Sequence, residues 1–405
     1  MRSIFLKSLC PLALAAGEGF ALSLYDTAPA IGLPESQALH YSLSARLGYD
    51  DNINSSTNTK TKSEYVGATL SASYSDFEST TKKHFSANLG ATYYFKQANS
   101  TNNKWFSNNN ISAGLTHNFS DRCTYSLNAS LRYQPEPDYS NGISASRAQG
   151  DCINWSLTNA VTRSIDSRWS WTLNASTSGN YYAEKEYEYD DRQYINTGAS
   201  LNVRTSELVS YSLNCSYRWD FKKSGYGHNS NNLYLTLSTN RSLTPYSSMN
   251  MSVGVQEKFI KGQRIWTPSL RGGYNRTVAE GLSINFYASL DNENVNTYRG
   301  MVGSYLSNPA WRVGFNASYT WTPDVSLSFG CSYYTSNYSR GEGGLGSYRT
   351  STVAPTLGIN FRMTDKLRGN LQYTYTLSDS SYGNYASKGE KYGRNNIAFS
   401  TTYSF

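Results

Sequence analysis

The feature that most constrains this chain is an alternation of apolar and polar residues with a period of two. In residues 125–133, YSLNASLRY, tyrosine, leucine and alanine take one set of alternate positions, while serine, asparagine and arginine take the other. The stretches 169–176, 211–219, 282–290 and 325–334 divide in the same way. Successive side chains of a β-strand point to opposite faces, so each stretch predicts a strand with one apolar face and one polar face.

This alternation continues along almost the whole chain after residue 38 and predicts about 18 strands (16–18). The expected strands are 39–52, 63–77, 83–97, 106–119, 122–134, 150–163, 168–182, 193–205, 208–221, 230–241, 247–259, 264–276, 281–291, 310–321, 325–338, 351–362, 366–378 and 392–405. A tilted strand crosses a bilayer in about 9–11 residues, so these strands are long enough to cross it and project beyond.

The links between the expected strands alternate in length. Those after even-numbered strands are short, such as 120–121 and 206–207, and those after odd-numbered strands are long and polar, such as 135–149 and 292–309. Short turns at one end and long loops at the other are typical of outer-membrane barrels. We therefore predict an all-β fold, a transmembrane antiparallel up-and-down β-barrel, with both termini in the periplasm.

Composition supports a membrane barrel and excludes several other classes of protein. Aromatic residues make up 14% of the chain and charged residues only 16%, and no run of about 18 apolar residues follows the N-terminus. The aromatic content is too high for a disordered chain. The net charge of +7 is modest and no long basic run is present, so nucleic acid is not an expected partner.

The first residues have the pattern of a secretory signal, because basic residues precede an apolar stretch at 9–16 and small residues follow it. We assign 1–21 to a signal peptide and leave its cleavage site open. Residues 22–38 are then a short periplasmic N-terminal segment, and 39–405 form a single outer-membrane β-barrel.

The last expected strand carries a second export feature. Residues 397–405, IAFSTTYSF, end in Phe405, with Phe399 and Tyr403 on the same face. A terminal phenylalanine after alternating apolar residues resembles the C-terminal signal by which outer-membrane barrels are recognised for insertion. The barrel-assembly machinery is therefore an expected partner of this strand.

Because lipid surrounds such a barrel, its apolar face must point outward and its polar face toward the lumen. The parity of the expected strands places several arginines on the inner face, with acidic residues at its outer mouth. The expected pore-lining residues are Arg46, Arg132, Arg218, Arg271, Arg312, Asp50, Asp220 and Asp291. A lumen with more arginine than carboxylate favours anions. The alternative, that these arginines pair with acidic residues and brace the wall, is left open by the sequence.

No arrangement of residues predicts catalysis, a cofactor or a metal centre, so we expect a protein that is not an enzyme. The chain has four histidines, and His228, in an expected outer loop, is the one that could act as a base. No partner within hydrogen-bond reach is indicated for it. No CxxC or paired His–Cys spacing is present, and the acidic stretch 183–194 lacks the spacing of calcium ligands.

The end of the first strand carries a family resemblance. Tyr49, Asp50, Asp51, Asn52 and Ile53 resemble the Tyr-Asp/Glu-Asp-Asn-Ile/Leu element that follows the signal region in a family of bacterial β-barrel porins. The alternating Tyr-, Asn- and Ser-rich body and the terminal phenylalanine are similar to that family as well. Some members are associated with exopolysaccharide export, so the resemblance implies an outer-membrane barrel with a connection to polysaccharide. A cation site among Asp50, Asp51 and Asn52 is a further open alternative.

The expected function is that of an outer-membrane porin or channel. It passes small hydrophilic solutes or glycan chains through a polar, arginine-containing lumen, with a tie to exopolysaccharide export. The alternative is a plugged barrel that acts as a surface binding or adhesion protein through its long outer loops. The expected location is the outer membrane of a Gram-negative bacterium, where lipids and lipopolysaccharide surround the wall, and association into a homo-oligomer is left open.

Overall fold

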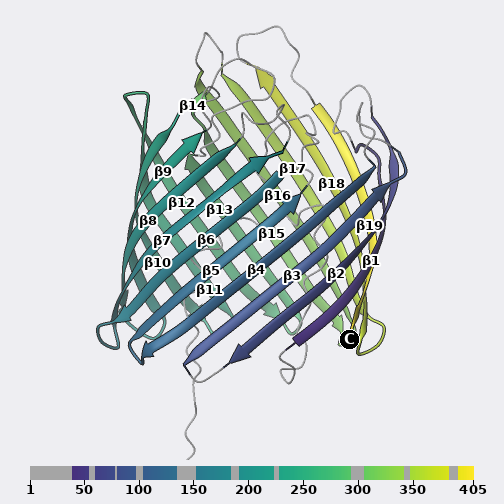
Figure 1. Ribbon diagram of the computed structural model, residues 1–405, viewed down its shortest axis with the longest axis horizontal. Coiled ribbons are helices and arrows are strands. Elements are labelled where there is room, and N and C mark those ends of the chain that lie inside the picture. The colour runs from purple at the N-terminus through teal and green to yellow at the C-terminus, as the bar shows by residue number, and fades with distance from the viewer. Residues whose placement is uncertain are drawn as a thin grey trace, which may run out of the picture.

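The computed structural model contains one antiparallel sheet that closes on itself into a barrel (Figure 1). It describes residues 39–53, 60–77, 80–96, 104–134, 152–183, 191–222, 228–292, 305–341, 347–382 and 391–405. No helix within these ranges has the length and apolar character needed to cross a membrane. The expected signal peptide and periplasmic segment, 1–38, lie outside the described residues.

Every expected strand is present, with ends shifted by at most four residues. The strands are β1 (Leu39–Asp50), β2 (Ser63–Phe77), β3 (Thr81–Tyr94), β4 (Trp105–Ser120), β5 (Cys123–Gln134), β6 (Cys152–Ser164), β7 (Trp169–Tyr182), β8 (Arg192–Arg204), β9 (Val209–Lys222), β10 (Ser230–Thr244), β11 (Ser247–Ile260), β12 (Gln263–Ala279), β13 (Leu282–Asn292), β14 (Tyr305–Ser307), β15 (Pro309–Thr322), β16 (Val325–Gly341), β17 (Tyr348–Arg362), β18 (Leu367–Tyr382) and β19 (Lys391–Ser404).

Strands β14 and β15 are two parts of one strand of the wall, so the closed barrel has 18 strands. Both parts pair with β16 in the same register, with Ser307 opposite Ser339 and Ala310 opposite Ser336. The interruption falls at Asn308, whose backbone N–H donates a hydrogen bond to the Asn292 side chain (2.9 Å). The predicted transmembrane-type all-β barrel of about 18 strands is confirmed as a fold.

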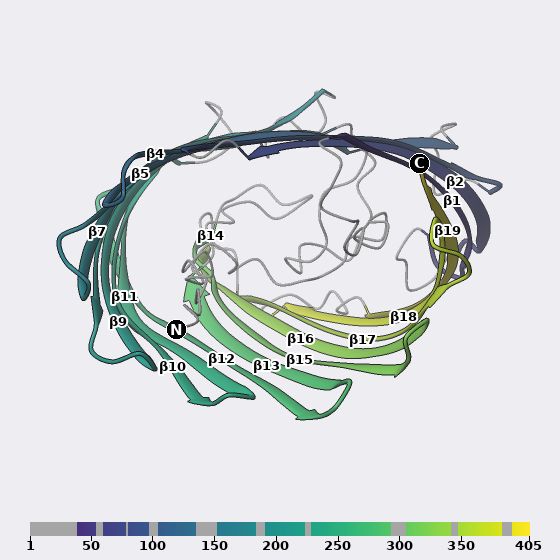
Figure 2. The same ribbon diagram turned by 90° about the horizontal axis from the view of Figure 1, so that it is seen from below.

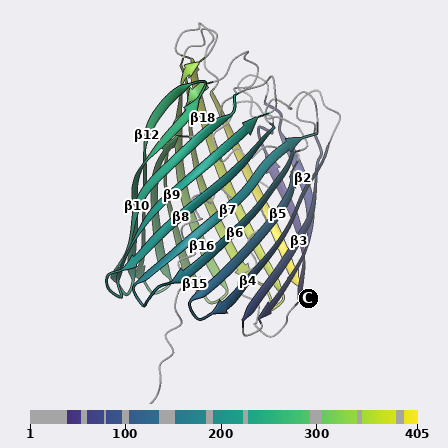
Figure 3. The same cartoon turned by 60° about the vertical axis from the view of Figure 1, so that its left-hand side comes forward.

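The barrel closes where the first strand pairs with the last. β1 and β19 run antiparallel from Ser42 opposite Ser404 to Asp50 opposite Asn396. Purple β1 lies beside yellow β19 in Figure 1, and Figure 2 shows the resulting ring, which is oval in cross-section. The tilt of the strands is clearest from the side (Figure 3). Closure gives each strand a hydrogen-bonded neighbour on both sides, which a sheet surrounded by hydrocarbon requires.

The two ends of the barrel differ in the links between strands. At one end, the turn end, links are short, such as 121–122 between β4 and β5 and 323–324 between β15 and β16. The other end, the loop end, carries the long links, with one exception. Lys261 and Gly262 alone join β11 to β12 there, and both have positive φ (50° and 72°), as a tight type I′ hairpin turn requires. The general pattern of long links after odd-numbered strands does not hold at this hairpin, where the expected strands 247–259 and 264–276 leave only four residues between them.

Asp166 orders one of the short links at the turn end, between β6 and β7. Its Oδ1 atom accepts hydrogen bonds from the backbone N–H groups of Arg168 (2.7 Å) and Trp169 (2.8 Å). These two hydrogen bonds favour the ionised carboxylate and hold the pKa of Asp166 below its ordinary value. The turn is therefore fixed by an ionised side chain at neutral pH.

The outer and inner faces of the wall differ as the alternation predicts. Along β1, Leu43, Leu47 and their neighbours of the same parity are exposed, whereas Ser44 and Asp50 of the other parity are buried. Side chains on the concave face of a closed barrel converge and shield one another, so the buried polar parity is the inner face. Exposed apolar side chains therefore surround the barrel, and polar side chains line its interior.

Large aromatic side chains are exposed near both ends of the outer face. Trp105 and Trp266 lie toward the loop end, and Trp321 and Phe405 lie toward the turn end. Phe405 also ties the end of the chain to the first strand, because its backbone N–H donates to Tyr41 O at 3.0 Å. Aromatic side chains in two belts, one toward each end of the outer face, are the arrangement found at the two interfaces of a membrane barrel.

Phe405 offers a direct test of the proposed insertion signal. We expect Phe405→Ala to slow assembly of the barrel into membranes by the barrel-assembly machinery, measured as the rate at which the heat-modifiable folded band appears in electrophoresis. Trp321→Ala is the matched control, because Trp321 (66% exposed) and Phe405 (61%) are similarly exposed at the same end. Equal rates for the two variants would show that the terminal aromatic has no special role.

Candidate functional site

The inner face carries a strong excess of positive charge. The described strand residues of inner parity include three acids, Asp50, Asp220 and Asp291, and all three lie toward the loop end. The cations of that parity in the loop half and middle of the wall are Arg46, Arg132, Arg192, Arg218, Lys222, Lys258, Arg271, Arg312 and Arg394. Each of the three acids contacts one of these arginines.

Asp50 and Arg394 form a buried ion pair across the closing seam. Asp50 is 0% exposed and Arg394 is 6% exposed. Arg394 Nε lies 3.0 and 2.9 Å from the two carboxylate oxygens, and Nη2 lies 2.5 Å from Oδ2. The Asn396 side chain (3.2 Å) and the Asn52 backbone N–H (3.0 Å) also donate to this carboxylate. The charge is therefore neutralised and its hydrogen-bonding capacity largely satisfied, as a buried carboxylate requires.

The other residues of the YDDNI stretch extend this connection between β1 and β19. Asp51 accepts hydrogen bonds from the backbone N–H (2.7 Å) and side chain (2.6 Å) of Asn395. The Asn52 side chain donates to Gly393 O at 3.0 Å. Asp50, Asp51 and Asn52 thus hold residues 393–396 of the last strand in one register. We call this set of contacts the seam clasp.

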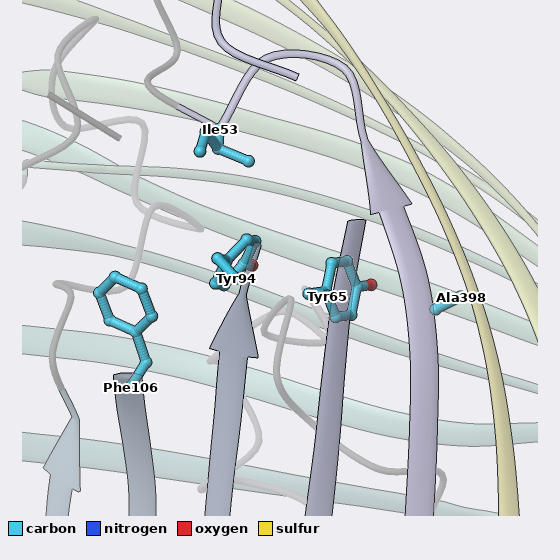
Figure 4. Packing of buried hydrophobic residues seen from close by; sticks show 5 residues of the cluster. All are labelled: Ile53, Tyr65, Tyr94, Phe106 and Ala398. Carbon is cyan, nitrogen blue, oxygen red and sulfur yellow. The ribbon is translucent and has the colours of Figure 1, made fainter. Parts of the chain in front are cut away.

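Ile53, the last residue of the stretch, turns onto the inner wall. It is 0% exposed and belongs to an apolar cluster with Tyr65, Tyr94, Phe106 and Ala398, which Figure 4 shows from close by. The aromatic rings contact one another in sequence, because the Tyr94 ring lies 5.1 Å from that of Tyr65 and 5.4 Å from that of Phe106. The chain after β1 is therefore anchored to the inner surface of β2, β3 and β4.

The seam clasp corrects two expectations for this stretch. Asp50 has the predicted inner parity, but its partners enclose it, so it does not expose a carboxylate to the lumen. The carboxylates of Asp50 and Asp51 accept hydrogen bonds from Arg394 and Asn395, which leaves them poorly suited to the open cation site considered above. The described ranges contain no group of three or more His, Cys, Asp or Glu side chains placed to hold a metal ion.

A second polar cluster surrounds Asp220 on β8–β10. Arg218 Nε donates to Asp220 Oδ1 at 2.6 Å, and the side chains of Ser230 and Asn232 donate to Oδ2 at 3.2 and 2.6 Å. The Arg218 guanidinium also lies 3.9 Å from the centre of the Tyr194 ring, a cation–π contact. Asp220 is 5% exposed, so it braces Arg218 and presents little charge to water.

Lys258 and Arg394 are inner-face cations that the sequence analysis did not single out. Lys258 on β11 is 0% exposed and lies directly opposite Asn232 of the Asp220 cluster. Both cations could have been found from parity. The apolar residues Met251 and Val253 show that odd-numbered positions of β11 face outward, and Ile397 and Phe399 show the same for β19. Lys258 and Arg394 are even-numbered, so both face inward.

The third acid, Asp291, joins β13 to β12. Arg271 Nε donates to Asp291 Oδ2 at 3.1 Å, and Ser269 Oγ donates to Oδ1 at 2.7 Å. Half of the Arg271 side chain remains exposed. On the neighbouring strands β15 and β16, the Arg312 guanidinium lies 5.1 Å from the centre of the Tyr334 ring.

Arg46 contacts an aromatic ring of the wall, and Arg132 contacts an amide side chain. Arg46 lies over the Tyr65 ring at 5.3 Å, and no described acidic side chain is within ion-pair distance of it. Arg132 Nε donates to Asn108 Oδ1 at 3.5 Å. The arginines of the inner face therefore differ in their partners. Arg218 and Arg271 are paired with acids of the wall, as the bracing role requires. Arg46 has no described acidic side chain within ion-pair distance, as the selectivity role requires.

Comparisons with known proteins give a fold but no close relative. No family model matches the chain, and no curated protein matches it. Among solved structures, OccAB2 of Acinetobacter baumannii matches with a TM-score of 0.51 at 11% identity, covering 91% of this chain and 98% of that one. OpdO (11% identity) and OccK9, also called OpdG (12%), both of Pseudomonas aeruginosa, each match with a TM-score of 0.50, covering 91% of this chain and 97% and 98% of theirs.

This chain has the fold of the outer-membrane porins. At so low an identity the likeness extends to the fold alone. It adds nothing in favour of the exopolysaccharide connection that the YDDNI stretch implies.

The seam clasp makes a prediction about stability. Asp50→Ala leaves the buried Arg394 charge without its partner, so we expect it to lower the free energy of unfolding by about 3–5 kcal/mol. Denaturant titration of the refolded barrel, followed by tryptophan fluorescence, measures this change.

The control is Asp76→Ala, which removes an exposed pair with Lys83 (3.9 Å; 33% and 48% exposed). An exposed pair contributes about 0–1 kcal/mol. If the two variants were equally stable, the clasp would not be an important source of stability for the closed barrel.

Proposed function

We propose that this protein is a channel of the bacterial outer membrane that passes small hydrophilic solutes by diffusion and prefers anions. The observation that carries the proposal is the charge of the inner face. Its three described strand acids, Asp50, Asp220 and Asp291, are each paired with an arginine, and the described cations of the same parity outnumber these acids. A pore wall with such an excess of fixed positive charge attracts anions and repels cations.

The proposal includes location and surroundings. The porin fold, the exposed apolar outer face and its two aromatic belts support an outer-membrane position, with lipids and lipopolysaccharide around the wall. The polar inner face supports passage of hydrated solutes without covalent chemistry, and a fold shared with porins favours a channel over an enzyme. Association of the barrel into a homo-oligomer is left open.

Ion selectivity tests the proposal most directly. In a planar bilayer with a potassium chloride gradient, the reversal potential should show that chloride permeates more readily than potassium. Arg46→Gln should lower the chloride-to-potassium permeability ratio, because it removes an inner charge that no described acid compensates.

The matched control is the double variant Arg271→Gln/Asp291→Asn, which removes one positive and one negative charge and leaves the net charge of the lumen unchanged. We expect its permeability ratio to stay close to that of the unmodified protein. A refolded barrel that carries no current, or that prefers potassium, would falsify the channel proposal.

A glycan-exporting role, which the family resemblance implies, is the more specific form of this function and has its own test. We expect deletion of the gene to reduce surface exopolysaccharide if glycan chains use this lumen, and normal surface glycan would count against that role. The adhesion alternative depends on long loops at the loop end, most of which lie outside the described residues, and no described contact favours it.

A further inference from the structure

We propose that the inner wall of β12, β13 and β15 carries a subsite for a sugar ring that bears a carboxylate, built from Tyr287, Ser289 and Arg271. The proposal rests on the channel function above and names a class of solute that the channel would hold during passage. It stands on the register of three adjacent strands and on the position of one aromatic ring.

The ring of Tyr287 lies against the wall over a glycine of the next strand. Tyr287 on β13 is directly opposite Gly314 on β15, and a Cβ atom added at Gly314 would collide with the Cζ, Cε1 and hydroxyl atoms of that ring. On the other side, Tyr287 is directly opposite Gly273 of β12. Because neither cross-strand neighbour has a side chain, the ring can lie along the wall and turn its other face toward the lumen.

Other inner tyrosines show why Tyr287 is distinctive. Tyr65 lies over Gly48 in the same manner, but it is 2% exposed beneath the apolar cluster with Ile53. The ring of Tyr194 faces the Arg218 guanidinium at 3.9 Å, so one face is already covered. Tyr287 is only half-buried. An accessible tyrosine ring offers an apolar face to the C–H groups of a sugar and a hydroxyl for hydrogen bonding.

Groups that suit a carboxylate lie one step along the wall from this ring. Ser289, two residues after Tyr287, has the same inward parity and lies directly opposite Arg271 on one side and Arg312 on the other. Adjacent strands are about 4.7–4.9 Å apart, so both arginines start within about 5 Å of the Ser289 backbone.

Arg271 is held by Asp291 through Nε, yet half of its side chain is exposed. A guanidinium fixed at one nitrogen retains its other N–H groups for a carboxylate. Arg312 lies over the Tyr334 ring and adds positive potential on the other side of Ser289. An aromatic platform, a hydroxyl and a positioned guanidinium together match a uronic acid better than they match a neutral sugar or a simple carboxylate.

Equilibrium binding to the refolded, full-length mature protein tests this subsite, with glucuronate, glucose and acetate as separate probes in titration calorimetry. We expect glucuronate to bind more tightly than either glucose or acetate. Tyr287→Ala should weaken glucuronate binding by roughly five- to tenfold, because it removes the platform. Gly314→Val, which displaces the ring, should weaken it similarly while the heat-modifiable folded band is retained.

Two variants separate the subsite from general lumen charge. Tyr194→Ala removes an inner tyrosine whose face is already covered by Arg218, so glucuronate binding should be unchanged. Arg271→Gln/Asp291→Asn keeps the net charge but should abolish the preference for glucuronate over glucose. Glucuronate binding that is unaffected by Tyr287→Ala, or matched by acetate, would overturn the subsite.

The subsite and the channel proposal fail independently. Tyr287→Ala leaves every formal charge in place, so the reversal potential should not change. An anion-preferring channel that does not bind glucuronate overturns the subsite alone. A barrel that binds glucuronate through Tyr287 but carries no current overturns the channel alone.

Discussion

The pairing of β1 with β19 is the constraint on which the rest of this structure depends. A sheet in hydrocarbon cannot leave an edge, because each unpaired backbone N–H or C=O group there costs several kcal/mol. The paired residues of these two strands are more than 340 positions apart in the sequence, and they must pair in the correct register. The seam clasp acts at this point: Asp50 engages Arg394 on the inner side, Asp51 engages Asn395 on the outer side, and Asn52 binds the backbone of Gly393. A slip by one residue would break all of these contacts and reverse the faces of the strand.

Closure also determines the electrostatics of the interior. Alternation sends one parity of every strand inward, and on that parity cations far outnumber acids. The acids that are present do not act alone. Asp220 and Asp291 each fix the orientation of an arginine, and Asp50 is enclosed at the seam. Carboxylates therefore hold guanidinium groups in position on this wall, and the inner face keeps a net positive charge.

The sequence predicted the fold well because the signal is periodic and local. Strand β2 was predicted residue for residue, and most other boundaries were within three residues. The expected strands 247–259 and 264–276 placed a short link at the Lys261–Gly262 turn, although the general pattern of long links after odd-numbered strands does not include it. Among the candidate site residues, parity placed Arg46, Arg132, Arg218, Arg271 and Arg312 on one face, but it could not show which arginines have acidic partners. Arg394 and Lys258 satisfied the same parity and were overlooked, since nothing local marks them as members of a cluster.

What the sequence by itself determined is the set of properties that depend on neighbouring residues: the strands, their two faces and the sign of the charge on the inner one. A period of two fixes these whatever the strands pair with. What only the tertiary structure decided is which residues meet across strands. The YDDNI stretch could be seen as a loop start or a cation site until closure placed Asp50 beside Arg394 and Ile53 against Tyr94. Likewise, the ring of Tyr287 lies along the wall only because the register sets it opposite Gly314. Register is a property of two strands together, and no single strand contains it.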